Sequence, residues 1–198
     1  GKAEPELRGM GTTLVALGIS SHGILIANIG DSRAYLLRNR SIKKLTVDHT
    51  VIQDLINAGS IEERDLDHHP ISHVLTRSLG PMESIEVDTV LHSTLPQPGD
   101  RFLLCSDGLY NMVSEEEIAA HLMDKSPESV VDELIDLANR RGGTDNITIL
   151  VAVVPGESAN GSDSHPDALN EFSMRTSSFS DSFADDSPAH SVAVTHMG

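Results

Sequence analysis

The stretch from Asp100 to Leu109 constrains the fold more than any other part of the chain. Its apolar run from Phe102 to Cys105 ends in Ser106-Asp107-Gly108, and a helix-like segment follows. This pattern predicts a buried strand that delivers one carboxylate to the edge of a sheet. The glycine after Asp107 allows a sharp turn and leaves room for a ligand beside the backbone.

Two other acidic turns follow the same logic. Asp31 follows Gly30 between two apolar segments, and Asp145 follows Gly143 just before the last predicted strand. A structural turn explains any one of these aspartates, because Asp is a favoured turn residue beside Gly or Ser. Taken together, three carboxylates at three strand ends indicate a site with oxygen ligands for hard divalent cations.

Length and charge restrict the class of protein. A chain of 198 residues is long enough for one domain with a substantial core. Its net charge of -16 comes without a basic patch, which argues against partners such as nucleic acid or an anionic membrane surface. No apolar run approaches the length of about 18 residues needed to span a bilayer. The single cysteine, Cys105, is expected to fill the core, and a reducing, cytoplasmic location fits this usage.

Elsewhere in the chain, predicted strands alternate with predicted helices. Ser114 and Ser126 each stand where a helix N-cap is expected, and Thr50 opens a shorter helix with capping-box spacing to Gln53. Short polar turns between the first strands indicate an antiparallel meander. Besides the strand that ends at Cys105, strands are expected at residues 12–20, 24–29, 34–37, 42–45, 85–91 and 146–154.

The composition changes at Gly156, which divides the chain into a domain at residues 1–155 and a tail at residues 156–198. The tail is rich in serine and acidic residues, so it cannot bury enough apolar surface to offset the entropy of ordering. We therefore expect it to be disordered, and its removal to leave the melting temperature nearly unchanged. Three phenylalanines in the tail either form a docking motif for a partner or are scattered aromatics; they are Phe172, Phe179 and Phe183.

Six short motifs resemble, in order and spacing, those of the PP2C-type (PPM) metal-dependent protein serine/threonine phosphatases, and most of all those of the bacterial branch. The motifs lie at residues 11–13, 27–35, 45–49, 76–80, 104–109 and 143–148. The resemblance covers roughly residues 9–154. An ordered set of motifs is far more specific than any single acidic turn.

The resemblance implies an α+β fold, in which an antiparallel β-sandwich of two packed sheets is flanked by helices on both outer faces. It also implies a centre of two or three Mn²⁺ or Mg²⁺ ions at one edge of the sandwich. Asp107 and Asp145 match the family's catalytic metal ligands, and Asp31 matches the carboxylate that shares a third ion with Asp107 in bacterial members. The implied activity is dephosphorylation of phosphoserine and phosphothreonine proteins by a metal-activated water.

One part of the family pattern has no match in this chain. The family's first hairpin carries a phosphate-binding Arg and its next strand an Asp-Gly metal ligand, and neither is found before Gly9. We therefore expect a domain that lacks its N-terminal strands, and poor catalysis by this stretch alone. Three hypotheses about function follow: a metal-dependent phosphatase, a non-catalytic PP2C-like sensing or docking module, and an unrelated metallohydrolase. The retention of Asp31, Asp107 and Asp145 favours the phosphatase, because a non-catalytic chain has no physical need for all three.

Overall fold

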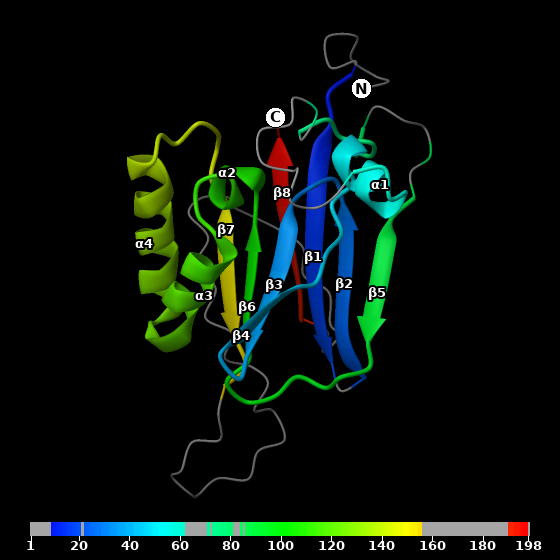
Figure 1. The fold of residues 1–198 in the computed structure, drawn as a ribbon. Helices are drawn as coiled ribbons and strands as arrows, with labels where there is room; N and C mark the ends of the chain where they lie inside the picture. Colours follow the sequence, from blue (N-terminus) through cyan, green and yellow to red (C-terminus); the bar gives the residue numbers. More distant parts are fainter. Residues whose placement is uncertain are drawn as a thin grey trace, which may run out of the picture.

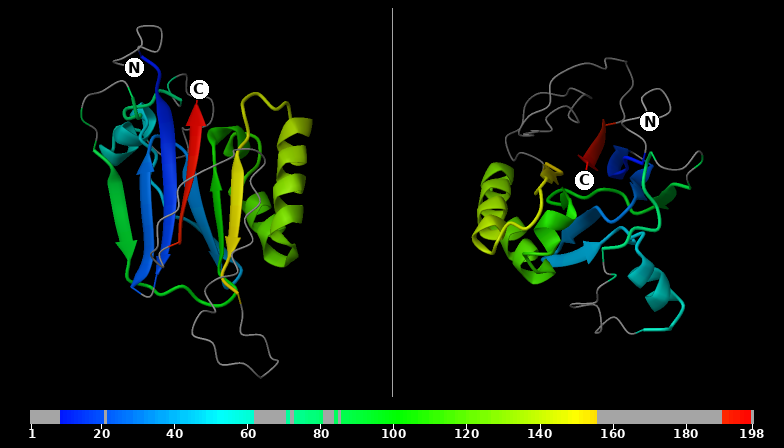
Figure 2. Two further views of the ribbon diagram at one scale, coloured as in Figure 1. Left: turned by 180° about the vertical axis from the view of Figure 1, so that it is seen from behind. Right: turned by 90° about the horizontal axis from the view of Figure 1, so that it is seen from above.

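A computed structural model of the chain describes residues 9–20, 22–61, 71, 73–80, 84 and 86–155, together with the backbone of residues 190–197. Within these ranges, two antiparallel sheets of four strands each pack face to face (Figure 1). Seen from above, the sheets form the central layers, and the helices lie outside them (Figure 2). The α+β sandwich expected from the sequence is therefore confirmed.

The first sheet contains the strand that precedes Asp31. Its strand order is β5-β2-β1-β8, where β1 is Thr12–Ser20, β2 is Gly23–Ile29, β5 is Asp88–His92 and β8 is His190–Met197. Strand β2 lies between β1 and β5, as its nearly continuous apolar sequence predicts for a central strand. The turn at Asp31 is thus anchored to the middle of a sheet.

The second sheet contains the strand that precedes Asp107. Its order is β4-β3-β6-β7, with β3 at Arg33–Arg38, β4 at Ser41–Lys44, β6 at Arg101–Cys105 and β7 at Ile149–Val153. The side chains of β6 alternate between two apolar clusters. Phe102 and Leu104 pack between the sheets, whereas Leu103 and Cys105 pack against the helices. Cys105 is fully buried, and burial raises the pKa of its thiol to about 12, so it fills the core as predicted.

Four helices stand in the described part of the chain: α1 (Val51–Asn57), α2 (Asp107–Tyr110), α3 (Glu115–Asp124) and α4 (Pro127–Arg140). Ser114 forms a complete capping box with Glu117, and Ser126 caps α4, so both predicted N-caps are confirmed. Helices α3 and α4 cover the outer face of the second sheet (Figure 1). Among the described residues, no helix packs across the outer face of the first sheet, so helices are found on one of the two outer faces where the sequence analysis expected both. None of these helices is long and apolar enough to cross a membrane.

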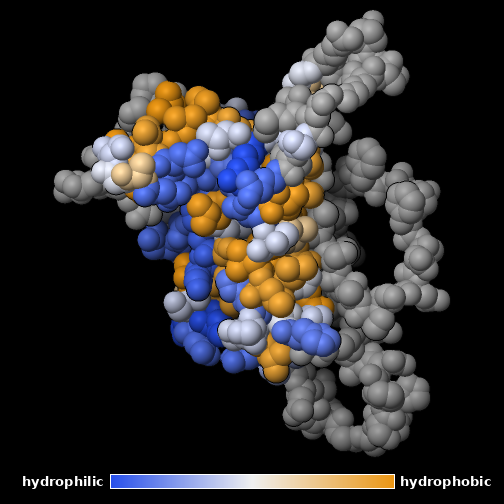
Figure 3. All heavy atoms as spheres, turned by 90° about the vertical axis from the view of Figure 1, so that its right-hand side faces the viewer, coloured by the Kyte–Doolittle hydropathy of each residue, from blue (hydrophilic) through white to orange (hydrophobic). Residues whose placement is uncertain are grey.

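Strand β5 and its neighbour β2 expose apolar side chains on the side of the molecule where α1 also lies. Figure 3 shows apolar residues gathered among polar ones on this side. Leu25 on β2 is 44% exposed, and Leu91, its partner on β5, is 60% exposed. Exposed apolar groups that lie together in this way mark a surface suited to contact with further polypeptide.

Strand β8 departs from the disorder predicted for the whole tail. Residues 190–197 pair antiparallel with β1, from Thr12↔Met197 to Ile19↔His190. Strand β1 offers a row of backbone N–H and C=O groups along this edge, and such edges attract another strand. The segment from Ser191 to Thr195 is rich in β-branched residues, which favour extended structure. Residues 156–189 lie outside the described residues, so the disorder and domain boundary predicted there remain predictions.

Deleting residues 190–198 should weaken β1, contrary to the expectation that the tail is dispensable. The β1 amides that bond to β8 would lose their acceptors, so they should exchange with solvent faster. The melting temperature should fall by about 2–4 °C for each kcal/mol of pairing that is lost. Amide hydrogen exchange and calorimetry on the full and shortened chains measure both effects. An unchanged exchange pattern in β1 would show that β8 contributes nothing to this edge.

Candidate metal centre

The turn after β6 and the turn before β7 are joined by hydrogen bonds between the Ser106 side chain and the backbone. Ser106, the last residue before α2, donates a hydrogen bond from its hydroxyl to the carbonyl oxygen of Asn146 at 3.0 Å. The same hydroxyl accepts a hydrogen bond from the backbone N–H of Thr148 at 3.0 Å. A Cβ atom at Gly108 would stand 2.4 Å from the Asn146 carbonyl oxygen, so only glycine permits this approach. The two acidic turns therefore lie side by side.

Asp31, in the turn after β2, lies close enough to the start of α2 to interact with Asp107. The Asp31 residue is only 8% exposed. Burial, together with the negative charges of Asp107 and Asp48, raises the pKa of Asp31. Tyr110 on α2 donates a hydrogen bond from its hydroxyl to the Asp31 carbonyl oxygen at 3.1 Å. Like charges are thus held near one another at a place where a cation would stabilise them.

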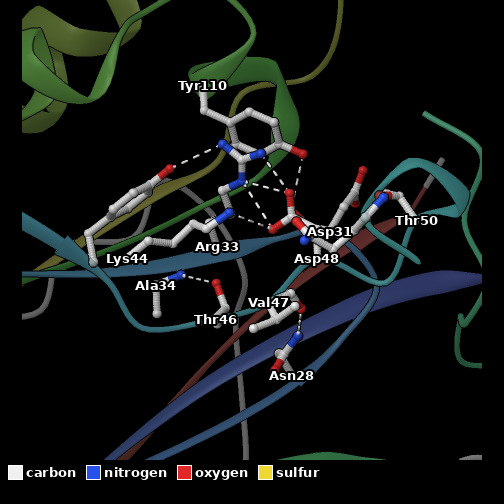
Figure 4. A network of polar contacts seen from close by, with 12 residues as sticks. Asn28, Asp31, Arg33, Ala34, Lys44, Thr46, Val47, Asp48, Thr50 and Tyr110 are labelled. Atoms are coloured by element: carbon white, nitrogen blue, oxygen red, sulfur yellow. Dashed lines mark hydrogen bonds and ion pairs between the residues drawn. The ribbon is translucent and has the colours of Figure 1, made fainter. Parts of the chain in front are cut away.

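An arginine that the sequence analysis did not single out lies beside these acidic residues (Figure 4). Arg33 on β3 binds the Asp48 carboxylate through Nε and Nη2, with 2.6 Å between Nη2 and Oδ2. Its guanidinium carbon lies 3.5 Å from the centre of the Tyr110 ring, close enough for a cation–π contact. Arg33 therefore neutralises Asp48 and supports the helix that carries Tyr110. Arg33 and Asp48 both lie inside the motifs that resemble the phosphatase family, and this position was the one feature of the sequence that could have pointed to them.

Asp145 is exposed, and its Oδ1 atom accepts a hydrogen bond from the backbone N–H of Asn146 at 2.7 Å. Across the described ranges, no group of three His, Cys, Asp or Glu side chains is placed to hold a metal ion by itself. The structure thus brings together the turns that carry Asp31, Asp107 and Asp145, without a complete ligand set formed by their side chains. The oxygen donors present fit Mn²⁺ or Mg²⁺ in chemical type.

A β-sandwich with acidic turns gathered at one end defines a candidate cation-binding protein, and comparison with known proteins gives its family. The family profile described as "Protein phosphatase 2C" matches residues 1–145. The chain is 45% identical over 152 residues to the serine/threonine phosphatase stp of Listeria welshimeri, covering 76% of this chain and 59% of that protein. It is 40% identical over 151 residues to the serine/threonine protein phosphatase PstP of Mycobacterium tuberculosis, covering 76% of this chain and 29% of PstP. The chain belongs to the protein phosphatase 2C family.

Solved structures agree with this assignment. A crystal structure of M. tuberculosis PstP matches with a TM-score of 0.73 and 38% identity, over 78% of this chain and 65% of that one. The PstP catalytic domain in complex with two manganese ions matches with a TM-score of 0.66 and 37% identity, over 78% and 64% of the two chains. The fold inferred from the six motifs is confirmed. The chain spans 59% of the length of the Listeria relative.

Replacing Asp31 with asparagine should raise the free energy of unfolding of the metal-free chain. Burial and the nearby negative charges disfavour the Asp31 carboxylate, and asparagine keeps its shape without the charge. Urea denaturation at about pH 7 with a chelator present measures the difference, and the exposed Asp136→Asn on α4 is the control. Added Mn²⁺ should stabilise the wild type more than the variant. A less stable Asp31→Asn chain in chelator would contradict this reading of the charges.

Proposed function

We propose that this chain is part of a metal-dependent phosphatase that hydrolyses phosphoserine and phosphothreonine in proteins. The observation that carries the proposal is the gathering of the Asp31, Asp107 and Asp145 turns at one end of a protein phosphatase 2C fold. Relatives from Listeria and Mycobacterium bear the name serine/threonine phosphatase, which supports phosphorylated proteins as the substrate class.

Asp107 and Asp145 are the side chains that we propose as ligands of two ions, with Asp31 and Asp107 sharing a third. Mn²⁺ or Mg²⁺ would supply an activated water and shield the charge of the phosphate. The manganese complex of the PstP catalytic domain supports the choice of metal. Repulsion between Asp31 and Asp107 would be relieved on binding, so metal should also stabilise the fold.

The residues around the acidic turns act by fixing their position. Ser106 holds the Asp107 turn to the Asn146 backbone, and Tyr110 holds the Asp31 turn to α2. Arg33 is bound to Asp48 and stacked on Tyr110, so its positive charge is already paired within the protein. We therefore assign Arg33 to positioning α2 and not to binding the substrate phosphate.

A non-catalytic sensing or docking module is the alternative. The observation in its favour is that the described side chains do not form a metal-binding group of three. Such a module would retain the fold and the apolar surface near β5 while showing no metal-dependent turnover. The two functions differ in a single measurable property, which is hydrolysis that requires Mn²⁺ or Mg²⁺.

The test is hydrolysis of a phosphothreonine peptide by the chain and, in parallel, by the product of its complete coding sequence. We expect the complete product to release phosphate only with added Mn²⁺ or Mg²⁺, and a chelator to abolish the release. The chain alone should be slower, because it spans 59% of the Listeria relative. Activity that survives chelation would overturn the metal mechanism. Absence of activity from the complete product would favour the docking module.

We further propose a reducing, cytoplasmic location, which fits a single cysteine that is fully buried. A docking partner for the tail is a separate proposal that rests on Phe172, Phe179 and Phe183. These three residues lie outside the described part of the chain. Binding of the tail peptide to a candidate partner, compared with a peptide in which the phenylalanines are alanine, tests the idea.

A further inference from the structure

His49 forms two hydrogen bonds with the turn that carries Asp31, one through its backbone and one through its ring. Its backbone N–H donates to the Gly30 carbonyl oxygen at 2.9 Å. In return, the Gly30 N–H donates to Nδ1 of the His49 ring at 3.1 Å. Gly30 has a φ of +94°, and a Cβ atom there would stand 2.3 Å from Cγ2 of Thr13, so this residue cannot be anything larger. The residue before Asp31 is therefore fixed by one histidine.

The hydrogen bond from Gly30 determines which tautomer the His49 ring adopts. Because Nδ1 accepts the amide hydrogen, the ring proton must be on Nε2. That nitrogen lies 3.0 Å from Oδ2 of Asp88 on β5, so it donates to this carboxylate. The other oxygen of Asp88 accepts from Nη1 of Arg77 at 2.6 Å. Burial raises the pKa of Asp88, but the hydrogen bonds from His49 and Arg77 outweigh it, and the net shift is downward.

The same segment also supports the loop at residues 73–80. The backbone N–H of Thr76 donates to the His49 carbonyl oxygen at 2.9 Å. The N–H of Val51 donates to the Val74 carbonyl oxygen at 2.9 Å. His49 thus stands between the Asp31 turn on one side and this loop on the other, and its own side chain is only 5% exposed.

We propose that His49 is a positioning residue for the metal centre, and that it acts by holding Gly30 so that the Asp31 carboxylate stays beside Asp107. The proposal rests on the function proposed above. Asp31 is buried near two other carboxylates, which repel it when no cation is bound. A turn with only a glycine and a serine on either side of Asp31 has little stiffness of its own against that repulsion. The two hydrogen bonds between Gly30 and His49 restrain the glycine side of the turn. They act in addition to the bond from Tyr110 to the Asp31 carbonyl oxygen and the bond between the Thr13 and Ser32 hydroxyls.

Two substitutions separate the two roles of the ring. In His49→Asn, the side-chain oxygen takes the place of Nδ1 and can accept from Gly30, but the reach to Asp88 is lost. In His49→Gln, the amide nitrogen takes the place of Nε2 and can donate to Asp88, but the acceptor for Gly30 is lost. Each variant keeps one of the two hydrogen bonds of the ring, and both keep the backbone bond to the Gly30 carbonyl oxygen. A histidine that matters only for stability should therefore be affected similarly by both substitutions. His121→Gln on α3 is the matched control, because its ring contacts Glu117 and Glu133 and, among the described residues, not the acidic turns.

The experiment measures the Mn²⁺ concentration for half-maximal hydrolysis of a phosphothreonine peptide by the complete gene product, together with amide exchange at Gly30. We expect His49→Gln to raise that concentration about tenfold or more, and His49→Asn and His121→Gln to stay within about threefold of wild type. Exchange at Gly30 should be faster in His49→Gln and slow in His49→Asn. Equal metal dependence for the two His49 variants, or a wild-type value for His49→Gln, would overturn the positioning role and leave the proposed function intact. A wild type without any metal-dependent hydrolysis would instead overturn the proposed function.

Discussion

Replacing Asp107 with asparagine should reduce metal-dependent hydrolysis by the complete gene product about a thousandfold. Asparagine has the same shape as aspartate but no negative charge, so it is a poor ligand for a hard cation. Charge stabilisation by a catalytic metal is worth several kcal/mol, and a loss of about 4 kcal/mol corresponds to a thousandfold lower rate. Initial rates over a range of Mn²⁺ concentrations measure the loss. The fold should survive, because Asp107 is the first residue of α2, asparagine has the same size there, and the N-cap Ser106 is unchanged.

The control for Asp107→Asn is Asp132→Asn on α4, which changes the net charge equally at an exposed position. It should keep the wild-type rate and the wild-type dependence on Mn²⁺. Circular dichroism and melting curves of the three proteins exclude unfolding as the cause. An Asp107→Asn protein with more than about a tenth of the wild-type rate would show that Asp107 does not hold a catalytic ion.

Replacing Asp48 with alanine should destabilise the chain by about 3–5 kcal/mol. Asp48 is the bidentate partner of Arg33, and their side chains are only 8% and 20% exposed. Removing the carboxylate leaves the guanidinium largely buried against Tyr110 without its counter-charge. Burial lowers the pKa of Arg33, but the charge of Asp48 outweighs this and holds the pKa above its ordinary value. Urea denaturation monitored by circular dichroism measures the change.

The double variant Arg33→Met with Asp48→Leu shows whether the loss comes from an unpaired charge. Apolar replacement of a whole buried pair is often nearly neutral, because it removes the cost of desolvating both charges. We expect the double variant to be more stable than Asp48→Ala by about 2 kcal/mol or more. If the double variant is equally unstable, the pair stabilises the fold through its geometry, and Arg33 is more than a counter-ion for Asp48.

Local signals in the sequence located most of the elements that frame the candidate site. The N-caps at Ser114 and Ser126 and the apolar run of β6 depend on neighbouring residues alone, so they could be predicted. Strand β7 was predicted to start at residue 146 but begins at Ile149. The residues before Ile149 do not extend the strand, because the backbones of Asn146 and Thr148 form hydrogen bonds with the Ser106 hydroxyl.

Contacts between distant side chains could not be predicted in the same way. Arg33 and Asp48 stand in different motifs, and nothing in either motif alone says that the two side chains meet. The pairing of β8 with β1 depends on an edge formed by a strand far away in the sequence. Asp31, Asp107 and Asp145 were singled out as turn residues, and the structure adds that Ser106 and Tyr110 tie their turns together.

The pairing of β1 with β8 has a consequence for synthesis of the chain. Strand β1 is the first described strand to leave the ribosome, and β8 is the last. During translation, the edge of β1 that pairs with β8 stays unpaired until all the other described strands have been synthesised. Closing so long a loop is entropically costly, so the pairing of β1 with β8 should be slow to form. A nascent chain is therefore most exposed to strand exchange with a second molecule at β1.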